Sequence, residues 1–134
     1  MDASDQAAVS KKAYWAGWVM SVLPTLMLVM SAGMKLARTP QVLEGFSKMG
    51  YPGNMPLILG VVELGCTIIY LIPRTSVLGA ILLTGYLGGA VDVHVRGGEW
   101  QFLAPVVFGI LVWGGLYLRD PRIRALIPLR SSLR

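Results

Sequence analysis

Four long apolar stretches fill this chain, and they constrain its fold more than any other feature of the sequence. They cover residues 13–36, 55–72, 76–95 and 102–118. A transmembrane helix needs about 20 predominantly apolar residues to cross the hydrocarbon core of a bilayer. We therefore predict an all-α fold, an integral membrane four-helix bundle in which each stretch forms one helix.

The composition supports this prediction. Hydrophobic residues make up 54% of the 134 residues and charged residues only 14%, whereas soluble domains carry about 25% charged residues. Four crossings use most of the length and leave a short polar tail over residues 1–12 and a basic tail over residues 119–134. The first stretch is about twice as long as the apolar region of a cleaved signal peptide, so we interpret it as a retained helix.

The positive charge of the chain predicts its orientation. The net charge is +5, and eight of the twelve Lys and Arg residues flank the stretches on the side of the two termini. Cytoplasmic flanks carry the excess of Lys and Arg in membrane proteins, so both termini are predicted to be cytoplasmic. No basic stripe alternates with aromatic residues, which argues against nucleic-acid binding. Anionic lipid headgroups are the partner we expect for the five tail arginines, namely Arg119, Arg122, Arg124, Arg130 and Arg134.

Ionisable residues lie inside or at the ends of these stretches, where lipid disfavours them. They are Lys35, Glu63, Asp92 and His94. A charge at the centre of a membrane helix costs about 3 kcal/mol on insertion scales, so such groups are usually paired, buried between helices or used. With both termini inside, all four fall in the outer half of the bundle, and we expect a binding or proton-relay site there. Asp92 and His94 are two residues apart and point in different directions, so we expect only one of them to face Glu63.

Each of these four residues also has a purely structural interpretation. Glu63 can be neutral or paired and then fixes only the helix register, and Lys35 can serve only as an interface anchor. Asp92 can pair with Lys35 or with Arg96. His94 lies near the membrane interface, where a solvated histidine needs no further role.

Other kinds of site have little support. One histidine and one cysteine argue against haem and zinc sites, and the single Cys66 excludes a disulfide within the chain. No phosphate-binding loop, nucleophile elbow or catalytic triad is present.

The connections carry three further signals. Apolar residues at 42, 43, 46 and 49 predict a short amphipathic helix at the interface, followed by a turn at 50–53. Thr75 or Ser76 is suited to cap the third helix. The Gly85-x-x-x-Gly89 spacing permits close approach of another helix, and we favour packing within the chain over a homo-oligomer.

Several short motifs occur in order along the chain. They are SAGMKL at 31–36, MGYP at 49–52, GVVELG at 60–65, LIPRT at 71–75, LGAILLTGYLGGA at 78–90 and HVR at 94–96. This order resembles the DoxX-like family of small four-helix bacterial membrane proteins, over residues 15–118. The resemblance implies a multi-pass protein of the bacterial inner membrane.

The resemblance also implies a direction for function. The family takes its name from a subunit associated with a thiosulfate:quinone oxidoreductase, and relatives are discussed in redox and thiol-stress contexts. Lys35, Glu63 and His94 match the polar pattern of the family. The lone Cys66 departs from members that have a thiol pair, which argues against thiol–disulfide chemistry here.

Three hypotheses follow for the function. The first is a non-catalytic or accessory subunit of a quinone-linked redox system, in which Lys35 or His94 donates to a quinone carbonyl and Glu63 relays protons. It implies the lipid bilayer and a membrane redox subunit as partners. The second is a scaffold or assembly factor without a ligand, in which Glu63 pairs with Lys35 to lock the bundle. The third, a small-molecule transporter, is disfavoured because no inverted repeat is visible.

Overall fold

The computed structural model describes residues 9–130, and every regular element in this part of the chain is helical. The long helices are α2 (Lys11–Leu36), α4 (Met55–Leu71), α5 (Ser76–Arg96) and α6 (Leu103–Arg119). The shorter helices are α3 (Pro40–Lys48), η1 (Pro73–Thr75), η2 (Trp100–Phe102) and α7 (Pro121–Leu126). Most of the predicted polar tail (residues 1–8) and Arg134 lie outside the described residues.

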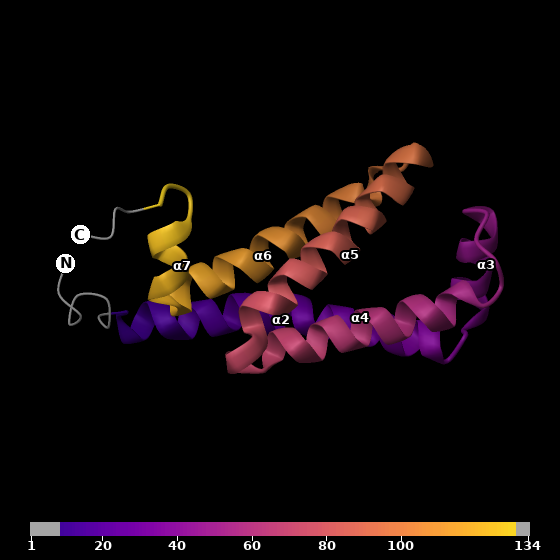
Figure 1. Ribbon diagram of the computed structural model, residues 1–134. Coiled ribbons are helices and arrows are strands. Elements are labelled where there is room, and N and C mark those ends of the chain that lie inside the picture. Colours follow the sequence, from indigo (N-terminus) through magenta and orange to yellow (C-terminus); the bar gives the residue numbers. More distant parts are fainter. Residues whose placement is uncertain (1–8, 131–134) are drawn as a thin grey trace.

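The four long helices form a ring in which α2 contacts α4 and α6, and α5 contacts the same two helices. Figure 1 shows α2 alongside α4, with α5 and α6 as a second pair that crosses the first. The two pairs lie close together at the end that carries α7 and diverge toward the end that carries α3 (Figure 1). We call these the α7 end and the α3 end.

Three segments are long and apolar enough to cross a membrane: Lys11–Leu36, Pro73–Arg96 and Trp100–Arg119. Helix α4 is apolar but has only 17 residues, about 26 Å at 1.5 Å per residue. Large apolar side chains cover the outside of the bundle, and Leu26, Ile81 and Ile110 are each more than half exposed, as expected where lipid is the solvent. The all-helical fold is confirmed, whereas four crossings and cytoplasmic termini stay predictions.

Small and polar residues hold the helices together at the α7 end. The buried Tyr70 hydroxyl lies 2.7 Å from Ser21 Oγ and 2.8 Å from the Val112 carbonyl oxygen, so it joins α4 to α2 and α6. A Cβ atom on Gly17 would lie 2.7 Å from the carbonyl oxygen of Gly115, so only glycine allows α2 and α6 this approach. Packing of small residues and buried hydrogen bonds are the usual forces between membrane helices.

The turn between α4 and α5 differs from the prediction. Thr75 is the N-cap residue of α5, but its side chain makes no capping bond there. The Thr75 hydroxyl instead donates to the Ile69 carbonyl at 2.7 Å, and that of Ser76 donates to the Tyr70 carbonyl at 2.8 Å. The short connection brings both hydroxyls to the last carbonyls of α4, which have no partner within their own helix.

The Gly85–Gly89 motif also has a different role from the one predicted. A Cβ atom at either position would meet nothing within 4 Å, so the expected packing against another helix within the described chain is wrong. Both glycines line a cavity instead. The homo-oligomer alternative for this motif stays a prediction.

The α3 end is shaped by three helix ends of the same kind. Helices α2, α3 and α5 are each followed by a residue with positive φ, respectively Arg38 (52°), Gly50 (80°) and Gly98 (70°). After α3, the Tyr51 amide donates to the Phe46 carbonyl at 3.0 Å, and after α5 the Glu99 amide donates to the His94 carbonyl at 3.0 Å. These are Schellman turns, in which the chain folds back over the last helical turn.

Candidate functional site

Lys35 and Glu63 form an ion pair inside the α3 half of the bundle. The Lys35 Nζ lies 2.7 Å from Glu63 Oε2, and their side chains are 14% and 2% exposed. Lys35 Nζ also donates to Ser31 Oγ at 2.7 Å, and Ser31 Oγ lies 3.3 Å from the same carboxylate oxygen. The structure therefore brings together two of the four predicted site residues and adds Ser31 to them.

The local sequence explains how these groups meet. Ser31 and Lys35 are four residues apart and lie on one face of α2. Glu63 lies on α4, which contacts α2 closely because Gly60 has no side chain: a Cβ atom there would lie 3.0 Å from the Cβ of Lys35. Because the two charges compensate each other, the pair avoids most of the cost of a lone charge among apolar helices.

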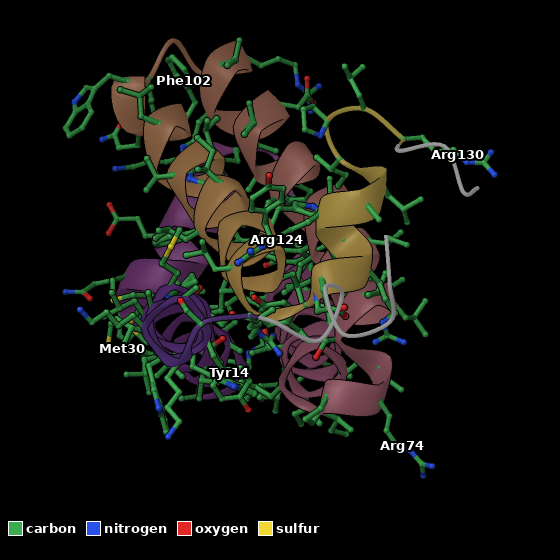
Figure 2. All side chains as sticks on the ribbon, turned by 90° about the vertical axis from the view of Figure 1, so that its left-hand side faces the viewer. Tyr14, Met30, Arg74, Phe102, Arg124 and Arg130 are labelled. Carbon is green, nitrogen blue, oxygen red and sulfur yellow. The ribbon has the colours of Figure 1, made fainter. Side chains whose placement is uncertain are left out.

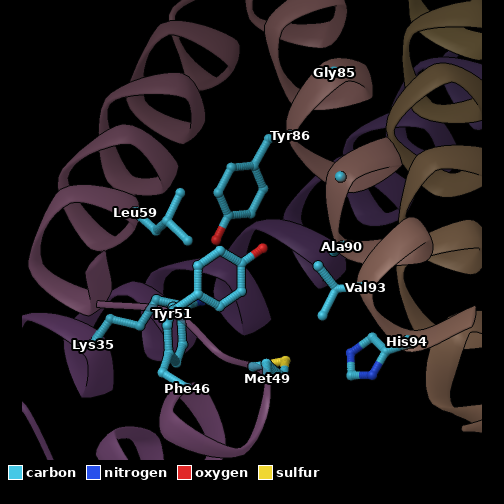
Figure 3. Close-up of a pocket in the computed structure, with 11 residues that line it drawn as sticks. Lys35, Phe46, Met49, Tyr51, Leu59, Gly85, Tyr86, Ala90, Val93 and His94 are labelled. Carbon is cyan, nitrogen blue, oxygen red and sulfur yellow. The ribbon is translucent and has the colours of Figure 1, made fainter. Parts of the chain in front are cut away.

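A cavity of about 370 Å³ adjoins this ion pair. It lies between the α3 region, α4 and α5, and Figure 3 shows the side chains that face it. Its volume is in the range of small-molecule sites, which is about 300–1,000 Å³. The residues that line it are Lys35, Phe46, Met49, Tyr51, Leu59, Gly85, Tyr86, Gly89, Ala90, Val93 and His94.

The cavity is apolar with a few polar groups at its wall. Tyr51 and Tyr86 project into the space between Leu59 and Ala90 (Figure 3). Lys35 Nζ lies 5.8 Å from the centroid of the Tyr86 ring. An ammonium group has three hydrogens to donate, and in the described part of the chain Lys35 uses two of them, toward Ser31 and Glu63. One donor is left for a ligand.

His94 and Asp92 lie in different places, although both are on α5. His94 lines the cavity, and its Nδ1 lies 2.9 Å from Glu99 Oε2. An ionised carboxylate only accepts hydrogen bonds, so Nδ1 carries the proton in this contact. Asp92 lies on the exposed surface and pairs with Arg96 at 3.0 Å. Of these two residues, only His94 shares the cavity with Lys35. Neither His94 nor Asp92 pairs with Glu63, although one of them was expected to face it.

The sequence interpretation did not select Tyr86, Tyr51 or Ser31 as site residues. Tyr86, Ala90 and His94 are spaced by four residues and share one face of α5. Once His94 is taken as a site residue, this spacing predicts that Tyr86 faces the same site. Tyr51 gave no such signal, because the Schellman turn after α3 determines its position.

Within residues 9–130, no three His, Cys, Asp or Glu side chains gather in a way that suits a metal ion. Cys66 is a free, buried cysteine on α4. Its position in the apolar core is that of a small hydrophobic residue.

The comparisons with known proteins agree with the fold. No curated protein and no solved structure matches this chain. The sequence model of the DoxX-like family matches residues 19–115, which include all four long helices at least in large part and the whole cavity wall. This chain is therefore a membrane protein that belongs to the DoxX-like family.

Proposed function

We propose that this protein is an accessory subunit of a quinone-linked redox system in the bacterial inner membrane. In this proposal the cavity at the α3 end holds the headgroup of a quinone, or another small amphipathic molecule with a carbonyl group. The observation that carries the proposal is the Lys35 ammonium, which has one unused donor at the wall of an apolar cavity of about 370 Å³.

The chemistry of the cavity suits such a ligand. A quinone headgroup is a flat apolar ring with carbonyl oxygens that accept hydrogen bonds. Phe46, Leu59 and Val93 offer apolar walls to the ring, and Lys35 offers a charge-assisted donor to one carbonyl, which is stronger than a neutral hydrogen bond. His94 is the second candidate donor, through Nε2 of a doubly protonated ring, because its Nδ1 faces Glu99. Glu63 is the candidate group that takes up and releases protons behind Lys35.

A second candidate function is a membrane scaffold or assembly factor without a ligand. The buried Lys35–Glu63 pair favours it, because Glu63 is only 2% exposed and is not among the residues that line the cavity. In this case the pair serves to fix the register of α2 against α4.

A pair of glycine substitutions on α5 tests the first proposal. Gly89 lines the cavity, whereas Gly88 lies on another face of the same helix and lines a groove beside α6. Neither position has an atom within 4 Å of a built Cβ, so leucine is expected to fit at both without disturbing the fold. Gly89→Leu fills the cavity, and Gly88→Leu is the matched control.

The measurement is the amount of quinone that co-purifies with each protein, from solvent extraction and mass spectrometry. We expect Gly89→Leu to lower the retained quinone at least about tenfold, a loss of roughly 1.4 kcal/mol in binding free energy, and Gly88→Leu to leave it unchanged. Equal retention by two folded variants contradicts the proposal. A wild-type protein without quinone that co-purifies with a membrane enzyme or receptor supports the scaffold function instead.

A further inference from the structure

At the α7 end, opposite the cavity described above, Arg119 carries a charge that forms no ion pair within the described residues 9–130. It is the last residue of α6, and its side chain returns toward α2 and α4. The guanidinium carbon lies 4.1 Å from the centroid of the Trp18 ring and 5.7 Å from that of Tyr70. Nε donates to Ser21 Oγ at 3.3 Å. Aromatic rings and one hydroxyl therefore fix the orientation of the guanidinium.

Within the part of the chain that the structure describes, the terminal nitrogens of Arg119 have no acceptor. Nη2 is buried, and among the described residues it is the only buried side-chain nitrogen or oxygen with no hydrogen-bond partner. A guanidinium has five N–H donors, and within residues 9–130 this one satisfies only one of them. An unpaired buried donor on a charged group is costly, which makes this guanidinium a candidate for binding an acceptor from outside the described residues.

The neighbouring carboxylate does not supply that acceptor. Asp120 is bound by Arg122, whose Nε and Nη2 donate to its two oxygens at 3.1 and 3.0 Å. Burial alone would raise the pKa of Asp120, but the hydrogen bonds and the charge of Arg122, together with the charge of Arg119, outweigh burial and hold the pKa below its usual value. Asp120 and Arg122 thus form a neutral pair, and Arg119 attracts Asp120 without sharing a hydrogen bond or an ion pair with it.

A cavity of about 360 Å³ opens beside Arg119. Its walls include Tyr14 and Trp18 from α2, Pro73 from the α4–α5 connection, Arg122 from α7, and Asp120, whose carboxylate is already bound by Arg122. The α7 end is basic around this cavity: Figure 2, which views the molecule from that end, shows Arg74 and Arg130 extending away from the helices. Such a field raises the local concentration of anions.

We propose that this cavity binds a phosphate-type oxyanion, with Arg119 as its principal ligand. A planar guanidinium matches the geometry of phosphate oxygens and donates two parallel hydrogen bonds to them. The oxyanion can come from the headgroup of an anionic phospholipid or from free phosphate. Tyr14 and Trp18 favour the lipid, because such rings lie at headgroup depth in membrane proteins.

The test compares Arg119→Gln with Arg74→Gln, which removes the same charge from the same end of the molecule but from an exposed side chain that does not line the cavity. Native mass spectrometry of protein released from nanodiscs of mixed phosphatidylglycerol and phosphatidylcholine reports which lipid stays bound. We expect the wild type and Arg74→Gln to retain phosphatidylglycerol preferentially, and Arg119→Gln to lose that preference about tenfold, as expected for the loss of a charge-assisted hydrogen bond.

Two further measurements make every outcome decisive. If Arg119→Gln does not fold, Arg119→Lys replaces it: the charge stays but the planar fork is lost, and lipid retention is again expected to fall. In delipidated wild-type protein, inorganic phosphate is compared with chloride at equal ionic strength by thermal melting. A rise in Tm with phosphate, without lipid preference, supports a free-phosphate site. No lipid preference and no rise in Tm, or equal lipid preference in the wild type and both Arg119 variants, overturns the proposal.

Discussion

The Lys35–Glu63 contact puts two full charges in a region that lipid surrounds, and the surrounding residues show why this is tolerated. The two oppositely charged atoms are 2.7 Å apart, and Ser31 contacts both. Replacing a buried ion pair by apolar residues is often neutral for stability, whereas removing one partner leaves a buried charge without compensation. The pair is therefore a strong constraint on which single substitutions the bundle accepts.

This reasoning predicts a large coupling between the two residues. We expect Glu63→Gln and Lys35→Met each to lower the free energy of unfolding by about 3 kcal/mol, and the double variant to lie closer to the wild type than either single variant. The measurement is denaturation in mixed micelles, followed by circular dichroism.

The exposed pair Glu44–Lys48 on α3 is the matched control, with a separation of 3.2 Å and side chains 68% and 75% exposed. A double-mutant cycle there is expected to give a coupling below about 0.5 kcal/mol. Additive effects of Glu63→Gln and Lys35→Met would show that the buried contact contributes nothing specific.

The sequence allowed part of the site to be predicted at this level of detail. Lys35, Glu63 and His94 stood out because charged and titratable groups are rare inside apolar helices. The pairing of Lys35 with Glu63 was one of the hypotheses, and Asp92 was expected to pair with either Lys35 or Arg96. Which of these partners a residue has depends on how each helix is rotated about its axis. Lys35 lies at the end of a helix, so its spacing from other residues does not reveal this rotation.

Contacts between helices were harder to predict, because only some of the glycines in the sequence lie where two helices approach each other closely. Gly79 faces the backbone of Tyr70, whereas Gly85 and Gly89 face a cavity. All three occur in apolar segments with similar neighbours, so only the geometry distinguishes them. For this reason the G-x-x-x-G spacing predicted helix packing at Gly85 and Gly89, which is not where the helices approach closely.

Two alanine substitutions test this distinction. Gly79→Ala places a Cβ against the backbone of Tyr70, which cannot move without separating α4 from α5, and we expect it to lower the free energy of unfolding by about 2 kcal/mol. Gly65→Ala on α4 meets nothing within 4 Å, so better helix propensity is expected to stabilise it by about 0.5–1 kcal/mol. Thermal melting in detergent measures both, and equal changes would contradict the assigned contacts.

The Schellman turns at the α3 end show another limit of prediction. Gly50 and Gly98 are recognisable turn residues in the sequence, but Arg38 adopts positive φ without being glycine. Its Nη2 donates to the Gly53 carbonyl at 3.1 Å, which compensates part of the backbone cost. The consequences are functional, because these turns bring Tyr51 back to Phe46 and Glu99 back to His94.

The attachment of α7 is expected to depend on pH through Asp120. Its carboxyl accepts from the Arg122 amide and side chain, and its pKa is lowered in the folded protein. A lowered pKa means that this stabilisation is complete above the unfolded value of about 3.9 and is lost as the pH falls through the still lower folded value. Asp120→Asn is therefore expected to lower Tm at pH 7, by the equivalent of at most about 1 kcal/mol for a pair with one exposed partner.

The difference in Tm between the wild type and Asp120→Asn is then expected to shrink as the pH falls below about 4, where the carboxyl becomes protonated. Melting curves of both proteins between neutral and acidic pH measure it. A difference that is constant over this range would show that the charge of Asp120 does not stabilise α7.

The molecule as a whole has two polar ends that differ in charge. The α3 end contains a neutralised pair beside an apolar cavity, and the α7 end contains Arg119 with unused donors among further arginines. Anionic lipids are concentrated in the cytoplasmic leaflet, and the excess of Lys and Arg lies at the α7 end. Both arguments predict that the α7 end lies in the cytoplasm and that the cavity lies toward the outer face.

Cysteine labelling tests this orientation. In a Cys66→Ala background, Asn54→Cys reports on the α3 end and Arg130→Cys on the α7 end, since both positions are exposed. A membrane-impermeant maleimide applied to intact spheroplasts is expected to label Asn54→Cys, and to label Arg130→Cys only after permeabilisation, because positive flanks stay inside. Labelling in the reverse order would place the cavity toward the cytoplasm, and labelling of both from one side would mean that the chain between them crosses the membrane an even number of times.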